Sequence, residues 1–255
     1  MLITQSFIFA AGRGERMRPL TDTLPKPLVP IKNKAIIDYS IEKLSKIPTM
    51  SKIIINGFYL ADQIEDHIKK LNNSKIIFSR EVAKIETGGG LVYALDKFDQ
   101  TQPILLINGD ILWQDGAASD IEQLCNAYNH NDCDILLGLK KTGEVLGYEG
   151  NGDFNFDKKT GELTRIFLQQ NSAVENSSKA NNDKALSHVF VGLQIVNPVI
   201  LKNAPTPPFS MSYFYKKATE ENGKLNRVKG FELQGRYFHI GEVKTIAEVE
   251  EALSL

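Results

Sequence analysis

Short apolar runs alternate with segments of helical spacing over about the first 140 residues, and this alternation constrains the fold more than any other feature. The runs at residues 7–9, 53–55, 76–78, 104–107 and 135–137 predict buried strands. Apolar residues three or four apart predict helices near residues 35–47, 60–71, 91–98 and 121–128. Strands that alternate with helices in this way predict an α/β fold with a doubly wound, mostly parallel, Rossmann-like sheet.

The pattern changes after about residue 140. Turn signals near residues 150–152 and 159–161 predict a hairpin-like segment, and the polar residues 169–184 predict a mobile surface loop. Two helices and three strands follow: the predicted strands lie near residues 189–196, 227–233 and 236–240, and the helices near residues 211–221 and 246–253. The second half is therefore expected to form a small mixed β region.

The most distinctive segment, residues 10–30, directly follows the first predicted strand. It opens with Ala10, Ala11, Gly12 and Gly14, whose small or absent side chains let main-chain N–H groups approach a phosphate closely. Three arginines and a lysine follow on a stretch that four prolines stiffen. These features predict a loop that grips a polyphosphate. The P-loop pattern does not fit, and neither does the dinucleotide-binding pattern, because Met17 stands where a third small residue is required.

These residues resemble the signature of the sugar-1-phosphate nucleotidyltransferases, Ala-Ala-Gly-x-Gly-x-Arg-x-x-Pro-Leu-Thr followed by Pro-Lys-Pro-Leu-Val-Pro. The resemblance implies that a sugar-1-phosphate oxygen attacks the α-phosphorus of a nucleoside triphosphate and releases pyrophosphate, with Mg²⁺ as cofactor. Arg16 is the candidate for the pyrophosphate, because a guanidinium fork bridges two oxygens. Lys26 is the candidate for the α-phosphate or the attacking phosphate.

Glu86, Thr87 and Gly88 open a glycine-rich run between a predicted strand and a predicted helix. Glycines at a helix entrance leave main-chain groups open to a base or ribose, although a plain flexible turn is the alternative. In the family that residues 10–30 resemble, the matching segment reads the nucleobase, so we predict nucleotide contact here. The run Glu-Thr-Gly-Gly-Gly resembles the N-acetylmuramate-1-phosphate uridylyltransferases, which are short members of this superfamily.

Asn108 and Asp110 come directly after the predicted strand at residues 104–107, so they are expected in the crevice at the carboxyl ends of the strands. Mg²⁺ needs only one or two protein carboxylates when substrate phosphates complete its shell. A helix cap or an Asx turn is the alternative role for this aspartate. The resemblance implies that Asp110 binds the metal, and we assign Asn108 to the sugar phosphate.

Gly152, Asp153 and Gly192 resemble positions that face the sugar phosphate, with a turn aspartate and packing glycines as the alternatives. The family shows Trp-Val-Asp-Val-Gly-Thr near its C-terminus, and its Asp is a second metal ligand. Here His239 stands at that place, and an imidazole is a poor Mg²⁺ ligand. A water, Glu242 or another acid could replace the carboxylate, or catalysis could be impaired. Alternatively, His239 could donate to a phosphate, or it could pack without touching a ligand.

The composition excludes several other classes of protein. With 30 basic and 31 acidic residues, the chain offers no general surface for nucleic acid or for a membrane. Its two cysteines are too few for a zinc site or a disulfide framework. No apolar stretch is long enough for a membrane span and the first residues lack a basic signal-peptide start, so a cytoplasmic protein is expected.

Three functions remain open from the sequence. The first is an enzyme that joins UTP and N-acetylmuramate 1-phosphate in cell-wall (peptidoglycan) recycling. The second is a mannose-1-phosphate guanylyltransferase or another sugar-1-phosphate nucleotidyltransferase. The third, suggested only by His239, is a regulatory protein that binds a nucleotide sugar without turnover. We expect one domain over residues 1–255, in which residues 1–140 bind the nucleotide and residues 141–255 cover the sugar phosphate. The sequence does not predict the oligomeric state.

Overall fold

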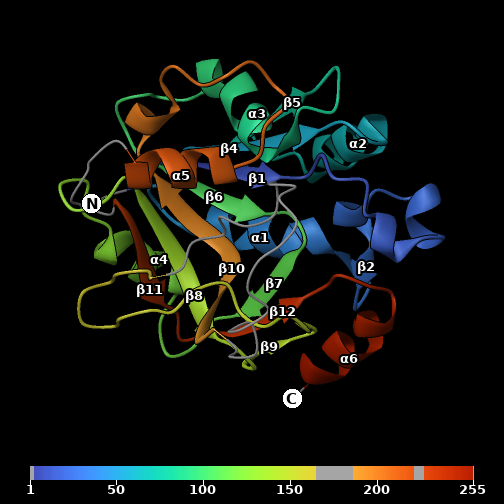
Figure 1. Ribbon diagram of the computed structural model, residues 1–255. Helices are drawn as coiled ribbons and strands as arrows, with labels where there is room; N and C mark the ends of the chain where they lie inside the picture. Colours follow the sequence, from blue (N-terminus) through green and yellow to red (C-terminus); the bar gives the residue numbers. More distant parts are fainter. Residues whose placement is uncertain (1–2, 165–185, 221–226, 255) are drawn as a thin grey trace, which may run out of the picture.

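A seven-stranded sheet runs through the centre of the protein (Figure 1). The computed structural model describes residues 3–164, 186–220 and 227–254, so the predicted loop at 169–184 lies outside the described residues. The strands of this sheet are β1 (Gln5–Phe9), β4 (Lys52–Gly57), β5 (Ile76–Arg80), β6 (Ile104–Asn108), β8 (Ile135–Lys141), β10 (His188–Val196) and β11 (Val228–Glu232).

The strand order is β11-β8-β10-β6-β1-β4-β5. Strands β6, β1, β4 and β5 are parallel to one another, and β11 is parallel to β8. Strand β10 lies between β6 and β8 and is antiparallel to both. The predicted doubly wound, mostly parallel sheet is therefore confirmed, with one antiparallel strand in its interior.

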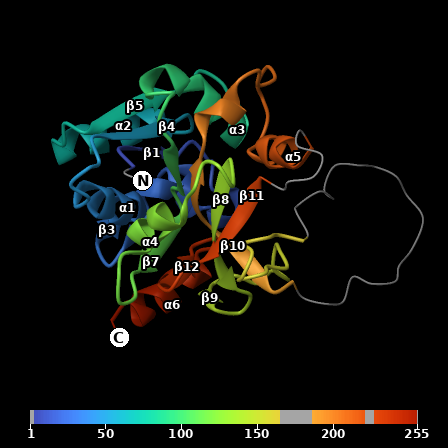
Figure 2. The same ribbon diagram turned by 90° about the vertical axis from the view of Figure 1, so that its left-hand side faces the viewer.

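Helices cover both faces of the sheet, as Figure 2 shows. One face carries α1 (Ile36–Ser45), α2 (Ala61–Leu71) and α4 (Asp120–Ala127), and the other carries α3 (Glu86–Tyr93) and α5 (Ser212–Glu220). Successive strand residues point to opposite faces. Ile8 and Ile55 accordingly pack in the core cluster of the first face, whereas Phe7 and Ile54 pack in that of the second.

A second, three-stranded sheet lies below the main one in Figure 1. It contains β7 (Ile111–Gln114), β12 (Arg236–His239) and β9 (Val145–Leu146), and a short pair joins β2 (Pro30–Ile31) to β3 (Lys34–Ala35). Helix α6 (Lys244–Ala252) packs there through Val249 and shares a core cluster with Met17, Leu112 and Phe238. This is the expected mixed β region, but β7 was not predicted. It pairs with β12 and so brings His239 opposite Ile111, next to Asp110.

Short 3-10 helices complete the chain: η1 (Glu15–Met17), η2 (Leu20–Asp22), η3 (Lys26–Leu28), η4 (Leu95–Lys97) and η5 (Pro198–Leu201). The predicted hairpin-like segment contains one antiparallel bridge between Phe156 and Leu163. The second half does more than cover a site, because β10 and β11 are strands of the central sheet. Within the described residues, every helix is too short or too polar to cross a membrane.

Candidate active site

The segment after β1 leaves the sheet and forms an open loop. The main-chain N–H of Ala10 donates to Asn56 Oδ1 at 2.6 Å, which ties the start of the loop to β4. A methyl group built at Gly12 would meet no atom within 4 Å, so the space beside this backbone is free for a ligand. Gly14 has φ +64°, and its carbonyl accepts from Thr21 Oγ1 at 2.8 Å. The loop is thus held at both ends and open in the middle.

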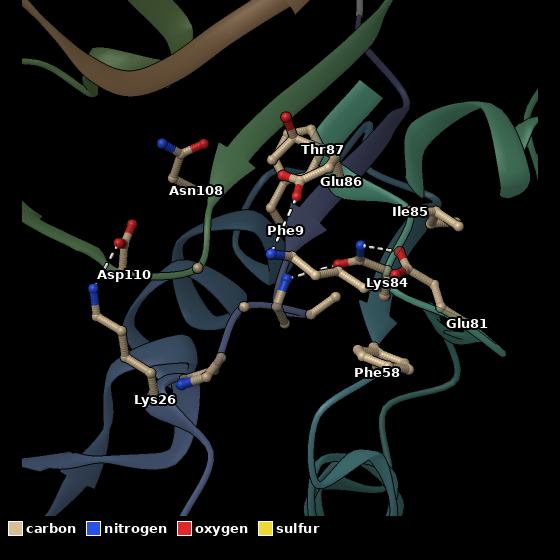
Figure 3. Close-up of a pocket in the computed structure, with 16 residues that line it drawn as sticks. Phe9, Lys26, Phe58, Glu81, Lys84, Ile85, Glu86, Thr87, Asn108 and Asp110 are labelled. Atoms are coloured by element: carbon tan, nitrogen blue, oxygen red, sulfur yellow. Dashed lines mark hydrogen bonds and ion pairs between the residues drawn. The ribbon is translucent and has the colours of Figure 1, made fainter. Parts of the chain in front are cut away.

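Three cavities share lining residues at the carboxyl end of β6. The first, of about 240 Å³, lies between Gly12, Glu81 and Thr87 and is called the Glu81 cavity (Figure 3). The second, of about 430 Å³, lies along residues 11–16 and is called the Arg16 cavity. The third, of about 120 Å³, is lined by residues 189–192 and by His239 and is called the His239 cavity.

One ion pair stands where these cavities meet. Lys26 Nζ donates to Asp110 Oδ2 at 2.7 Å, as Figure 3 shows. Asp110 lines all three cavities, Lys26 lines the Glu81 and Arg16 cavities, and Asn108 lines the Glu81 and His239 cavities. Burial raises the pKa of Asp110, but the charge and hydrogen bond of Lys26 more than offset this effect, so the pKa lies below its usual value. The carboxylate is therefore ionised at neutral pH.

Positive charge gathers on one side of this pair. Arg16 is exposed and lines the Arg16 cavity, and Lys26 is buried behind it. Arg18, two residues along the same loop, turns away: its Nε lies 3.1 Å from Asp22 Oδ1, and it lines none of the three cavities. Arg13 also lines the Arg16 cavity, so Arg13 and Arg16 are placed to bind an anion there and Arg18 is not.

His239 lies on the wall of the cavity that bears its name. Burial lowers the pKa of its imidazole, Asp110 raises it, and Lys26 and Arg16 lower it further, with a net shift to below the usual value. The ring is therefore neutral at pH 7, so one ring nitrogen can donate a hydrogen bond and the other can accept one. Its edge-on neighbour is Tyr148, with ring centroids 6.4 Å apart. The structure thus places His239 and Asp110 on the wall of the same cavity.

The donors at this site fit a magnesium ion that is held largely by its substrates. No cluster of three or more His, Cys, Asp and Glu side chains that could hold a metal occurs within the described residues. Among the described residues that line the His239 cavity, Asp110 supplies the one carboxylate, and Mg²⁺ accepts one carboxylate when phosphate oxygens and waters complete its octahedron. Asp110 would hold the ion.

The floor of the Glu81 cavity is a hydrogen-bonded relay that sequence reasoning missed. Asn56 Nδ2 donates to Glu81 Oε1 at 2.6 Å, while Asn56 Oδ1 accepts from Ala10 N. Both side chains are buried, and burial raises the pKa of Glu81 although the Asn56 amide offsets part of the shift. Figure 3 shows Glu81 and Lys84 on the same wall, and Lys84 also lines the Arg16 cavity. A lone acid in a polar stretch carries no pattern that would reveal it.

The glycine run differs from its prediction. Glu86 and Thr87 line the Glu81 cavity, but Gly88 lines none of the three cavities. Helix α3 begins at Glu86, so the three glycines lie inside its first two turns, where they are buried. The prediction of an open helix entrance at these glycines is therefore wrong, because protein atoms pack against the faces where their side chains would stand.

The remaining predicted residues fall into two groups. Gly192 lines the His239 cavity, and a Cβ atom built at this position would stand only 2.9 Å from Asn108 Cβ, so β10 could not pack this closely on β6 with a side chain here. Gly152 and Asp153 line none of the three cavities. Asp153 Oδ2 accepts from Phe190 N at 2.8 Å, so this carboxylate supports β10 at the edge of the His239 cavity.

Comparison with known protein families adds the observation that decides the family. Residues 5–166 match the nucleotidyl transferase family. The chain belongs to this family. The matched region contains β1, the open loop, Arg16, Lys26 and Asp110. The resemblance to the sugar-1-phosphate nucleotidyltransferases, predicted from residues 10–30, is thereby confirmed.

Similar proteins within this family have named activities. An N-acetylmuramate alpha-1-phosphate uridylyltransferase from Caulobacter vibrioides is 29% identical over 254 residues, covering 98% of this chain and 96% of that protein. The mannose-1-phosphate guanyltransferase beta-A of Xenopus laevis is 26% identical over 94% of this chain but only 62% of its own length. The solved structure of HddC from Yersinia pseudotuberculosis complexed with GMP-PN covers 98% of this chain with a TM-score of 0.71 and 22% identity, which shows a shared fold.

Proposed function

We propose that this nucleotidyltransferase transfers a uridylyl group from UTP to N-acetylmuramate 1-phosphate and releases pyrophosphate, a reaction of peptidoglycan recycling. The observation that carries the transfer chemistry is the position of the Lys26–Asp110 pair where three cavities share their walls. Such a junction suits a reaction in which the oxygen of a sugar phosphate must reach the α-phosphorus of a nucleoside triphosphate whose base is bound in a third cavity. The choice of UTP and of this sugar is supported by the Caulobacter relative, which this chain matches over nearly its full length.

In this proposal the Glu81 cavity takes the base and ribose, and the open loop takes the phosphates. Main-chain groups at Ala11 and Gly12 border free space, so triphosphate oxygens can reach them. Arg16 lines the Arg16 cavity, which in this proposal holds the β- and γ-phosphates. Its guanidinium there stabilises the pyrophosphate as it leaves. The sugar phosphate would enter through the His239 cavity, next to Asn108 and Gly192.

The reaction needs no dedicated base in this arrangement. A phosphate monoester has a second pKa near 6, so the attacking oxygen is already ionised at neutral pH. That oxygen forms a bond to the α-phosphorus while the bond from the α-phosphorus to the bridging oxygen of pyrophosphate breaks. Lys26 lies beside the reacting phosphorus and offsets the negative charge of the two substrates. Mg²⁺, when bound at Asp110, would add Lewis-acid charge stabilisation.

The test is a matrix assay of four nucleoside triphosphates against several sugar 1-phosphates, in which the magnesium-dependent release of pyrophosphate is measured for each pair. We expect the highest kcat/KM for UTP with N-acetylmuramate 1-phosphate. A clear preference for GTP with mannose 1-phosphate would favour the second candidate, which the Xenopus relative supports. Tight nucleotide-sugar binding with no pyrophosphate released from any pair would instead mean that the protein is a binding protein without turnover.

A further inference from the structure

A short strap from the second half of the chain holds the first turn of α3. The strap comprises residues 207–211, the last part of the segment that connects η5 to α5. Its main chain bonds to α3 in both directions: Gly89 N donates to the Phe209 carbonyl at 3.0 Å, and Phe209 N donates to the Ile85 carbonyl at 3.3 Å. A third bond runs from Met211 N to Thr87 Oγ1 at 2.9 Å.

The glycines of α3 make this contact possible. A Cβ atom at Gly88 would stand 2.6 Å from the Phe209 ring and 2.7 Å from the Ser210 carbonyl oxygen. One at Gly89 would stand 3.0 Å from Pro207 Cβ. Real Cβ contacts below 3.0 Å essentially never occur, so a side chain at Gly88 would force the strap away from the helix.

This first turn has little stability of its own. Glycine is the weakest helix former after proline, because it loses the most backbone freedom on folding. No side chain caps the helix at Ile85, and Glu86 adopts a left-handed φ of +63° that costs a non-glycine residue energy. The order of Glu86 and Thr87 therefore depends on contacts from outside the helix, and the strap supplies three hydrogen bonds and the Phe209 ring.

We infer that the strap is a positioning element for the nucleotide, and that Phe209 is its central positioning residue. Glu86 and Thr87 line the Glu81 cavity, whereas Phe209 does not, so Phe209 acts by fixing the wall that the nucleotide meets. The strap also connects this wall to the His239 cavity, the proposed site of the sugar phosphate. It continues from β10 through η5, and residues 189–192 of β10 line the His239 cavity.

This inference rests on the proposed function, in which the Glu81 cavity binds the nucleotide. The test compares Phe209→Ala, Gly88→Ala and the double variant with the wild type, using steady-state KM values for both substrates. Thr206→Ala is the matched control, because Thr206 is exposed directly before the strap and none of the hydrogen bonds between the described residues of the strap and α3 involves it. The nucleotide used is the one that the wild type prefers in the matrix assay, so failure of the proposed function is seen in the wild type and failure of the strap only in the variants.

We expect Phe209→Ala to raise the KM for the nucleotide by about tenfold, while the KM for the sugar phosphate changes by less than about twofold. Gly88→Ala should have the larger effect, and Phe209→Ala should rescue part of it in the double variant, because removing the ring makes room for the new methyl group. If Gly88→Ala does not fold, Phe209→Leu replaces it in the test: this variant keeps most of the packing volume, so its nucleotide KM should rise less than that of Phe209→Ala. An unchanged nucleotide KM in the folded Phe209 variants, or an equal loss for both substrates, would overturn the inference. A double variant no better than Gly88→Ala would also overturn the central role of Phe209, since the clash with the Ser210 carbonyl alone would then account for the displaced strap.

Discussion

Two glycine-containing segments border the Glu81 cavity, and they use the absence of a side chain in opposite ways. At Gly12 the space that a methyl group would fill holds no protein atom, whereas at Gly88 and Gly90 the nearest atoms stand 2.6 Å from an ideal Cβ. The open loop therefore leaves room for a ligand, and α3 uses its glycines to admit Phe209 on one side and the Glu81 carboxylate on another. Glycine content alone does not distinguish a ligand site from a tightly packed helix.

The largest effect on turnover is expected for two charged side chains of residues 10–30. Arg16→Ala and Lys26→Ala should each lower kcat by about a hundredfold or more, the scale seen when one preorganised donor is removed from a reacting centre. Arg18→Ala is the matched control and should stay near wild-type activity, because Arg18 faces Asp22 and lines none of the three cavities. Circular dichroism would first show that the Lys26 variant folds. Near-normal turnover in the Arg16 variant would remove that residue from the mechanism.

The comparison of the two segments is tested directly by the same substitution in each. Gly12→Ala should raise the KM for the nucleotide by about tenfold, equivalent to about 1.4 kcal/mol, without changing the free energy of unfolding. Gly90→Ala should lower the free energy of unfolding by about 1–3 kcal/mol, because its methyl group would overlap Glu81 Oε1 and Asn56 Nδ2. Urea denaturation and steady-state kinetics on both variants measure the two quantities. A stability loss in Gly12→Ala with unchanged kinetics would reverse the assignment of the open loop.

His239 offers a smaller effect at the other end of the site. With one carboxylate, the free protein should bind Mg²⁺ weakly and take it up mainly with the nucleotide. His239→Asp adds an oxygen ligand beside Asp110, so it should bind Mg²⁺ several-fold more tightly. Calorimetric titration of Mg²⁺ without nucleotide measures this directly, and the magnesium dependence of turnover provides a second measure. Identical titrations and unchanged turnover would mean that His239 lies outside the metal's reach.

The smallest expected effect concerns the relay at the cavity floor. Because burial raises the pKa of Glu81 in the folded state, the folded protein binds this proton more tightly than the unfolded chain. The contribution of Glu81 to stability is therefore complete below the unfolded pKa, about 4.3, and is lost as the pH rises through the folded pKa. Relative to Glu81→Gln, the wild type should lose stability as the pH is raised from about 4. Unfolding free energies that run parallel for the two proteins at all pH values would contradict this.

The sequence predicted the parts of the molecule that local pattern controls. The apolar runs at β1, β4 and β6 identify buried parallel strands. The run at residues 76–78, also predicted to be buried, forms the edge strand β5 and is only half-buried, because no strand of the described residues covers its outer side. The match at residues 10–30 identifies Arg16 and Lys26, which the structure places beside the same cavity. The sequence could not place β10 between β6 and β8, because that pairing depends on contacts across many residues. It missed β7, a short strand immediately after a turn, and it missed Glu81, whose burial depends on the absent side chain of Gly90.

The central position of β10 also bears on how the chain reaches its folded state. Strands β6 and β8 lie close in sequence, yet they do not pair with each other. Each pairs instead with β10, residues 188–196, which lies between them. A fragment ending at Lys141 would contain the open loop and Asp110 but would expose an unpaired edge of β6, which favours aggregation. Contacts so distant along the chain slow folding, since a long loop must close before they form. During synthesis on the ribosome, the free edge of β6 is therefore covered only after β10 has emerged.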